Sequence, residues 1–325
     1  MRRFLRGVLL TSAIAFCAVV GVAMWALPHR LPAMPALAGR IERGSLQHDG
    51  RDRTWIAYVP VKRAEHPALV IALHGSMGTG AQVREAFGYD FDLLADRQGF
   101  IVAYPQGYLG HWSDCRVMGP YAARRENVDD AGFLRALVDR LVADQSIDRT
   151  RVFVAGVSNG GSMTLCLALR SPGFARAYAA VAAAIPAPAN MIGLPKGEPV
   201  SVMLMNGTDD PIIPWQGGDV VLWPLLASRG PVLSAQASID YLRASAHLDG
   251  APRVTRFPDR DPNDGSTVER FLWSMPGKRQ VALYTIHGGG HGVPHPATFG
   301  RALLGHSNRD IRAAYEIWEF FRSAP

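Results

Sequence analysis

A glycine-flanked serine is the feature of this 325-residue chain that most directly suggests chemistry. Ser158 lies within Gly156-Val-Ser-Asn-Gly160, after the apolar run 151–155 and before 160–168, which has the composition of a helix. In a strand-to-helix turn of this kind the serine hydroxyl is exposed, and the flanking positions leave no room for side chains. The spacing therefore predicts a nucleophilic serine. The alternative is a glycine-rich turn without chemistry.

A serine hydroxyl is a poor nucleophile near neutral pH, so it needs a base and a carboxylate that orients the base. Where a strand-to-helix turn carries the serine, the acid follows it in the chain and the histidine comes last. Asp209 and Asp210 stand shortly after the apolar run 200–205. Either of them can be the acid, with the other capping the turn.

Three histidines follow the apolar run 281–286, at His287, His291 and His295. His291 has a glycine on each side and lies far enough past the expected strand to reach over the edge of a sheet. We therefore prefer it as the base. The carboxyl ends of parallel strands gather at one edge, where open α/β folds place their sites.

The negative charge of a tetrahedral intermediate requires backbone N–H donors. One is expected from Asn159, the residue after the nucleophile, and one from the loop after the first central strand. That loop is His74-Gly75-Ser76, and we expect the Ser76 N–H to be the second donor. A plain turn at the start of a helix is the alternative interpretation.

These residues must be positioned by elements that the hydrophobic pattern outlines. Strands are expected at 68–73, 100–104, 151–155, 178–184, 200–205 and 281–286, and helices near 91–97, 129–144 and 310–321. A hairpin that turns at Asp49-Gly50 is expected at the sheet edge, and Asn308 is the expected N-cap of the last helix. The stretches 186–199 and 211–231 are expected to be loops over one end of the sheet. This alternation predicts an α/β fold, with a mostly parallel central sheet, helices on both faces and one domain over 40–325.

The N-terminus has the pattern of an export signal or a membrane anchor. Arg2, Arg3 and Arg6 precede an uncharged run over 7–27. Such a run is long enough to cross a bilayer, and arginines before it direct the rest of the chain outward. Ala36-Leu-Ala38 offers a signal-peptidase site, so a cleaved signal and an uncleaved anchor both stay open. We expect residues 1–39 to be this segment with a Pro/Ala-rich stalk, and the protein to be extracytoplasmic, either secreted or anchored to the outer face of the cytoplasmic membrane.

The net charge of +6 comes almost wholly from arginine. These arginines are dispersed and often lie beside acidic residues, as in Asp259-Arg-Asp261, whereas a nucleic-acid surface clusters them among aromatic residues. We therefore expect no nucleic-acid partner, and contact with a membrane only through residues 7–27. A hydrophobic content of 48% with 19% charged residues fits a globular enzyme.

Outside the N-terminal run, the chain has two cysteines, Cys115 and Cys166. An exported protein meets oxidising conditions in which two cysteines can pair. Two separate buried thiols are the alternative. The sequence leaves this possible disulfide open.

Several motifs occur in the order seen in exported esterases. They are Leu73-His-Gly-Ser-Met-Gly78, Tyr104-Pro-Gln-Gly107, Asn127-Val-Asp-Asp-Ala-Gly-Phe133, Val154-Ala-Gly-Val-Ser-Asn-Gly-Gly-Ser-Met163, Asn206-Gly-Thr-Asp-Asp-Pro-Ile-Ile-Pro214 and Gly288-Gly-Gly-His291. Over about residues 45–321 the chain resembles the polyhydroxybutyrate depolymerase and feruloyl esterase family of α/β-hydrolases. The resemblance implies an α/β-hydrolase fold, no metal and no organic cofactor. It also implies Ser158, Asp210 and His291 as the catalytic triad, because the family's acid follows Gly-Thr after one intervening residue.

The residues and the resemblance together predict an exported serine carboxylic ester hydrolase that forms an acyl-enzyme. Its expected substrates are small or oligomeric esters, such as hydroxyalkanoate oligomers or feruloyl and acetyl-type esters. The chain departs from the family at two places, and the missing Trp beside His291 changes one wall of the acyl or alcohol pocket. Asn206 stands where the family usually has His, and Gly292-Val-Pro-His295 replaces a segment that usually carries Trp, Pro and Gly. A serine peptidase of the same fold and a non-catalytic, membrane-anchored binding protein are the alternatives.

Overall fold

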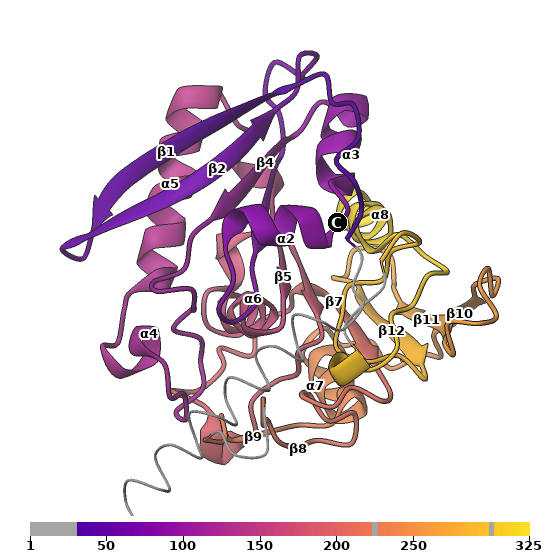
Figure 1. The fold of residues 1–325 in the computed structure, drawn as a ribbon. Coiled ribbons are helices and arrows are strands. Elements are labelled where there is room, and N and C mark those ends of the chain that lie inside the picture. Colours follow the sequence, from indigo (N-terminus) through magenta and orange to yellow (C-terminus); the bar gives the residue numbers. More distant parts are fainter. Residues whose placement is uncertain (1–30, 223–226, 299–301) are drawn as a thin grey trace, which may run out of the picture.

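The computed structural model describes residues 31–222, 227–298 and 302–325. A ten-stranded sheet runs through this part of the chain, in the order β1-β2-β4-β3-β5-β6-β7-β12-β11-β10 (Figure 1). Its six central strands are parallel and almost entirely buried, which explains why their sequences lack polar alternation. They are β3 (Leu69–Leu73), β4 (Ile101–Pro105), β5 (Val152–Val157), β6 (Ala177–Val181), β7 (Ser201–Gly207) and β12 (Val281–His287). All six expected strands are therefore present, with slightly shifted ends.

Both edges of the sheet are antiparallel. At one edge β1 (Arg40–His48) and β2 (Arg51–Val59) form the expected hairpin, and β2 pairs with β4. At the other edge β11 (Thr267–Trp273) pairs with β12, and β10 (Arg253–Arg256) pairs with β11. The hydrophobic pattern did not predict the largely exposed β10 or the half-buried β11, because both contain charged residues and lack the long apolar runs of the central strands.

Helices cover both faces of the sheet, as expected (Figure 1). One face packs against α5, α6 and α7, through side chains such as Phe133, Leu167 and Ile239. The other packs against α2, α3 and α8, through side chains such as Val83, Phe91 and Ile317. The helices are α2 (Gly80–Ala86), α3 (Asp90–Gln98), α4 (Ala122–Arg125), α5 (Asp130–Gln145), α6 (Asn159–Arg170), α7 (Ala235–Ser245) and α8 (Ala313–Ser323). Short 3-10 turns lie at Arg149–Arg151, Pro172–Phe174, Pro188–Asn190 and Ala302–Leu304.

The start of the last helix differs from the expected one. Helix α8 begins at Ala313 with Arg312 as its N-cap, so the expectation that Asn308 caps it is wrong. The Asn308 side chain is buried instead and donates to Ser266 Oγ (3.0 Å) and Asp310 Oδ2 (2.9 Å). A tertiary partner thus takes the amide that a local capping rule assigned to the helix end.

The two expected loop regions follow β6 and β7 and therefore begin at the carboxyl ends of these strands. Within the second region, β8 (Gly218–Asp219) pairs with β9 (Pro231–Val232) as a short antiparallel ladder. The Asn190 side chain of the first region donates to the Arg229 carbonyl of the second (2.9 Å). This hydrogen bond joins the two loops above the sheet edge.

Cys115 and Cys166 form a disulfide, with their Cα atoms 5.2 Å apart. Cys115 belongs to the loop after β4, and Cys166 belongs to α6, the helix that follows Ser158. The disulfide therefore ties a long loop to the helix that carries the candidate nucleophile.

The expected export segment over 7–27 lies outside the described residues. Of the helices in the described part of the chain, none is both long and apolar enough to cross a membrane.

We expect the disulfide to contribute about 4 kcal/mol to the free energy of unfolding, because it closes a loop between cysteines that are 51 positions apart. The double variant Cys115→Ser/Cys166→Ser should lose this amount in guanidinium chloride unfolding. Wild-type protein kept in a reductant should unfold like the variant, and the variant itself should not respond to the reductant. Equal stability of wild type and variant would contradict the expectation.

Candidate active site

Ser158 occupies a sharp turn between β5 and α6, with φ 55° and ψ −118°. This positive φ is unusual for a residue with a side chain. Both flanking glycines are sterically required: a Cβ at Gly156 would lie 2.2 Å from the Gly160 carbonyl oxygen, and one at Gly160 would lie 2.3 Å from the Leu73 carbonyl oxygen. The Ser158 N–H donates to the Val181 carbonyl (2.8 Å), which anchors the turn to β6. The local sequence thus presents the serine side chain at the carboxyl end of β5.

Ser158, His291 and Asp210 form a continuous hydrogen-bonded chain. His291 Nε2 lies 2.9 Å from Ser158 Oγ, and His291 Nδ1 lies 2.8 Å from Asp210 Oδ2. The other carboxylate oxygen, Asp210 Oδ1, accepts the N–H groups of Ile212 (2.8 Å) and Ile213 (2.9 Å). These donors fix the orientation of the carboxylate. An ionised Asp210 in this position favours the imidazole tautomer with its proton on Nδ1, which leaves Nε2 free to accept a proton from the serine.

Close backbone packing between loops brings His291 to this position. A Cβ at Gly290 would lie 2.0 Å from the Leu304 carbonyl oxygen, and one at Gly207 would lie 2.1 Å from the Gly289 carbonyl oxygen. Glycines at both positions let the loops after β7 and β12 approach closely. The Asp210 and His291 side chains meet as a result.

The other acid and histidines considered from the sequence lie elsewhere. Asp209 is exposed and takes no part in the chain of hydrogen bonds. His287 Nε2 lies 3.6 Å from a carboxylate oxygen of Glu269, and the buried His295 lies 3.5 Å from Asp90. The structure therefore brings Asp210 and His291 to Ser158 and places their neighbours in other surroundings.

The loop expected to supply an N–H donor lies against the nucleophile. A Cβ at Gly75 would be 3.3 Å from Ser158 Cβ, so Ser76 follows at close range. Asn159 is the first residue of α6, where a backbone N–H has no partner within the helix. Both expected donors thus belong to segments next to Ser158.

His74 shapes this loop, a role that the sequence alone did not suggest. Its Nδ1 donates to the Gly75 carbonyl (2.7 Å), its Nε2 accepts the Gly107 N–H (2.9 Å), and its own carbonyl accepts the Trp112 indole N–H (2.9 Å). Burial lowers the pKa of His74 to about 4. The imidazole is therefore neutral at neutral pH and serves as a fixed support for the loop.

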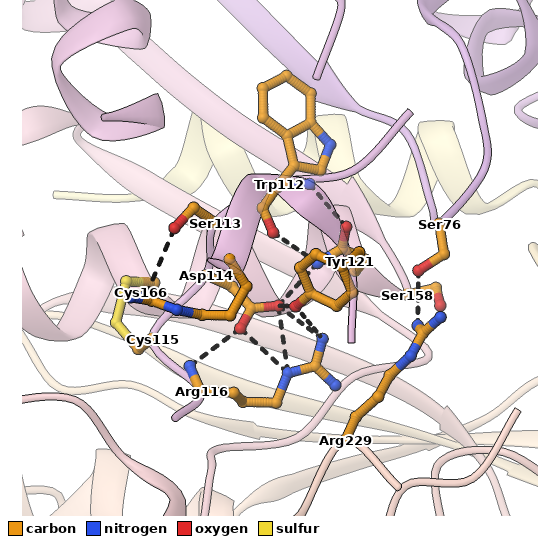
Figure 2. A network of polar contacts seen from close by, with 12 residues as sticks. Ser76, Trp112, Ser113, Asp114, Cys115, Arg116, Tyr121, Ser158, Cys166 and Arg229 are labelled. Carbon is orange, nitrogen blue, oxygen red and sulfur yellow. Dashed lines mark hydrogen bonds and ion pairs between the residues drawn. A yellow bond between two sulfur atoms is a disulfide. The ribbon is translucent and has the colours of Figure 1, made fainter. Parts of the chain in front are cut away.

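The side chain of Asn159 belongs to a buried polar network, and Figure 2 shows its partners Trp112 and Asp114. Its Oδ1 accepts the Trp112 N–H (2.8 Å), and its Nδ2 donates to Asp114 Oδ2 (2.7 Å). Asp114 in turn pairs with Arg116 (2.6 Å). The network holds the residue after the nucleophile in place through a segment far away in sequence. A sequence pattern gives no signal for such long-range partners.

In the described ranges, no three His, Cys, Asp or Glu side chains gather in a group that could hold a metal ion.

We expect His74 to make the protein less stable in acid. The unfolded chain binds a proton at His74 below about pH 6.5, whereas the folded protein does so only near pH 4. As the pH falls through this window, the free energy of unfolding should drop by about 3 kcal/mol because of this residue.

Urea unfolding of wild type and His74→Gln, compared near neutral pH and near pH 4, isolates this contribution. The wild type should lose more stability than the variant, by about the stated amount. If His74→Gln does not fold, titration of the His74 ring protons by NMR measures the same pKa. A ring that titrates at an ordinary histidine pKa would contradict the expectation.

The comparisons with known proteins point to esterases. A family model described as esterase PHB depolymerase matches residues 54–190. The putative esterase NocK of Nocardia uniformis subsp. tsuyamanensis is 28% identical, over 78% of this chain and 73% of its own length. Poly(3-hydroxyalkanoate) depolymerase C of Paucimonas lemoignei is 27% identical, over 81% of this chain and 65% of its own length.

Among solved structures, acetyl xylan esterase from Aspergillus awamori is similar to this chain in fold. It has a TM-score of 0.54 and 18% sequence identity, over 87% of this chain and 99% of its own. The sheet order, the helices on both faces and this similarity identify an α/β-hydrolase fold. The matched family model and the esterase relatives make the chain similar to the polyhydroxybutyrate depolymerase and feruloyl esterase family of α/β-hydrolases, and they support a carboxylic ester hydrolase.

Proposed function

We propose that this protein is an exported serine carboxylic ester hydrolase, with Ser158 as the nucleophile, His291 as the base and Asp210 as the acid. The observation that carries the proposal is the chain of two hydrogen bonds from Asp210 through His291 to Ser158 Oγ. Serine, histidine and carboxylate in this arrangement have the roles needed for acyl transfer.

The reaction proceeds in two transfers. His291 Nε2 takes the hydroxyl proton while Ser158 Oγ attacks the ester carbonyl carbon, and the tetrahedral intermediate forms. His291 then gives this proton to the departing alcohol oxygen, the ester C–O bond breaks, and an acyl-enzyme remains. Water, deprotonated by His291, attacks the acyl carbon, and the proton returns to Ser158 as the acid leaves. Asp210 stays ionised and stabilises the imidazolium throughout.

The backbone N–H groups of Ser76 and Asn159 are proposed to stabilise the negative oxygen of each intermediate. Preorganised donors of this kind are usually a large part of catalysis in a water-poor site. The neutral His74 and the network at the Asn159 side chain support the assignment, because they hold both segments in place.

For the substrate, we propose small or oligomeric esters, with hydroxyalkanoate oligomers and feruloyl or acetyl-type esters as the first to test. The names of the relatives support this range. The Asn206 side chain is buried and donates to the Ala183 carbonyl (3.0 Å), so it supports the strand ends rather than lining a pocket. The segment 292–295 carries no Trp beside His291, which changes one wall of the acyl or alcohol pocket.

For location, we propose that residues 1–39 direct export and that 40–325 form the catalytic domain. Arginines followed by the uncharged run 7–27 support export. The disulfide between Cys115 and Cys166 supports it independently, because disulfides persist in oxidising compartments.

Two alternative functions lead to different observations. A serine peptidase of this fold would cleave peptides in preference to aryl esters. A non-catalytic binding protein would be folded yet inactive on every short-chain ester, although the complete Ser158, His291 and Asp210 set speaks against it.

We expect a fluorophosphonate probe to label the purified wild type and not Ser158→Ala. Loss of the nucleophile should lower kcat on para-nitrophenyl acetate by a factor on the order of 10⁴ or more. Ser162→Ala, which alters a nearby buried serine of α6, is the matched control and should still be labelled. Undiminished labelling of Ser158→Ala would disprove the nucleophile assignment.

We expect the two neighbouring aspartates to differ sharply. Asp210→Asn should lower kcat by a factor on the order of 10⁴, since an amide cannot hold the imidazole in the required tautomer or stabilise its charge. Asp209→Asn should stay within a few-fold of wild type, because Asp209 is exposed. Steady-state kinetics of both variants decide the matter, and the opposite ranking would move the acid to Asp209.

A further inference from the structure

Arg229 is a buried charge that forms no ion pair with a carboxylate among the described residues. Only 6% of the residue is exposed. One of its amino groups donates to Ser76 Oγ (2.6 Å), and its guanidinium carbon lies 5.5 Å from the centre of the Tyr121 ring. In the described part of the chain, no Asp or Glu forms an ion pair with it. A buried cation normally has an anionic partner, since loss of hydration is costly.

Asp114, a carboxylate that acts electrostatically on Arg229, already has other partners. Asp114 pairs with Arg116 (2.6 Å), and it also accepts from Asn159 Nδ2 (2.7 Å) and from the Tyr121 hydroxyl (3.2 Å). Two guanidinium groups therefore share one carboxylate, and the cluster has an excess positive charge. Burial, followed by repulsion from Arg116, lowers the pKa of Arg229, which shows the same imbalance.

This excess charge lies next to the candidate nucleophile. Figure 2 shows the Arg229 side chain extending to Ser76, with Ser158 close to the pair. Ser76 follows Gly75, where a Cβ would lie 3.3 Å from Ser158 Cβ. A group bound by Arg229 would therefore belong to the same small molecule as the ester that Ser158 attacks.

We infer that Arg229 binds a carboxylate of the substrate, so that the preferred substrates are esters with a free acid group in their acyl or alcohol part. A guanidinium offers a planar fork of N–H donors that matches a carboxylate. The hydrogen bond to Ser76 Oγ orients this fork and leaves the remaining donors for the ligand. The inference rests on the proposed function, because it concerns the substrate of the same site.

Two pairs of chromogenic esters test the inference. For the acyl part, the pair is para-nitrophenyl hydrogen adipate and para-nitrophenyl methyl adipate. For the alcohol part, it is para-acetoxybenzoate and its methyl ester. Each pair differs by one negative charge. The measured quantity is the ratio of kcat/KM within a pair, so differences in the amount of active enzyme cancel.

In wild type, kcat/KM for the charged member should exceed that for the neutral member by roughly tenfold or more in at least one pair, because the methyl ester carbonyl accepts a weaker hydrogen bond than the carboxylate and carries no charge. The pair that shows this preference tells which part of the substrate carries the acid. Arg229→Gln should remove the preference, and Arg229→Lys should retain a part of it. Ser76→Ala should weaken it, because this variant removes the hydroxyl that orients Arg229 and keeps the backbone N–H.

Arg243→Gln is the control for overall charge. It also removes one arginine that lies over an aromatic ring, but in α7 beside Trp273, and it should leave the ratio unchanged.

Failure of the inference and failure of the proposed function look different. If wild type hydrolyses the neutral esters and reacts with fluorophosphonate but shows no preference for either acid, the carboxylate site is wrong and the esterase stands. The same holds if Arg229→Gln lowers both members of a pair equally, which would mean that Arg229 acts on the reaction in general. If wild type neither turns over any ester nor reacts with fluorophosphonate, the proposed function itself fails.

Discussion

The positive φ of Ser158 is the constraint on which the site depends. The turn is so tight that the Gly160 position would bring a Cβ within 2.3 Å of the Leu73 carbonyl oxygen at the end of β3. The chain that leaves β3 therefore starts against the turn, and Gly75 packs on Ser158. One steric requirement thus exposes the hydroxyl and also brings the loop with the Ser76 N–H to it. A side chain at Gly75 or Gly160 would push the loop that carries the Ser76 N–H away from the turn that carries the Ser158 hydroxyl.

The short segment 112–116 supports Asn159 and helix α6, which follow the nucleophile. Each of its first four residues has a hydrogen-bond, ion-pair or disulfide partner. The Trp112 backbone bonds to the Asn159 side chain, and the Ser113 N–H donates to the buried carboxylate of Asp130 (2.6 Å). Asp114 pairs with Arg116, and Cys115 is covalently joined to α6. Loops normally have few such restraints. Here the buried charges and the disulfide restrain the loop at several points along its length.

The hydrogen-bond partners of two histidines of the site determine what each histidine can do. His74 has both ring nitrogens bound to backbone groups, and its burial opposes protonation, so it supports the loop. His291 instead bridges a carboxylate and a hydroxyl, the arrangement that suits proton transfer. The same principle distinguishes the arginines. Arg116 is neutralised by Asp114 within the fold, whereas Arg229 is left with an excess charge at the site.

The sequence by itself determined the features that depend on neighbouring residues. The apolar runs defined the six parallel strands, and the glycines around Ser158 defined the turn, because sterics and hydrophobic periodicity act locally. Asp210 could be separated from Asp209 only by resemblance. The tertiary structure decided which side chains meet: Cys115 pairs with Cys166, the Asn308 side chain meets Ser266, and Arg229 meets Ser76 but, among the described residues, no carboxylate. Such contacts join segments far apart in the chain, and no local pattern encodes the distance between them.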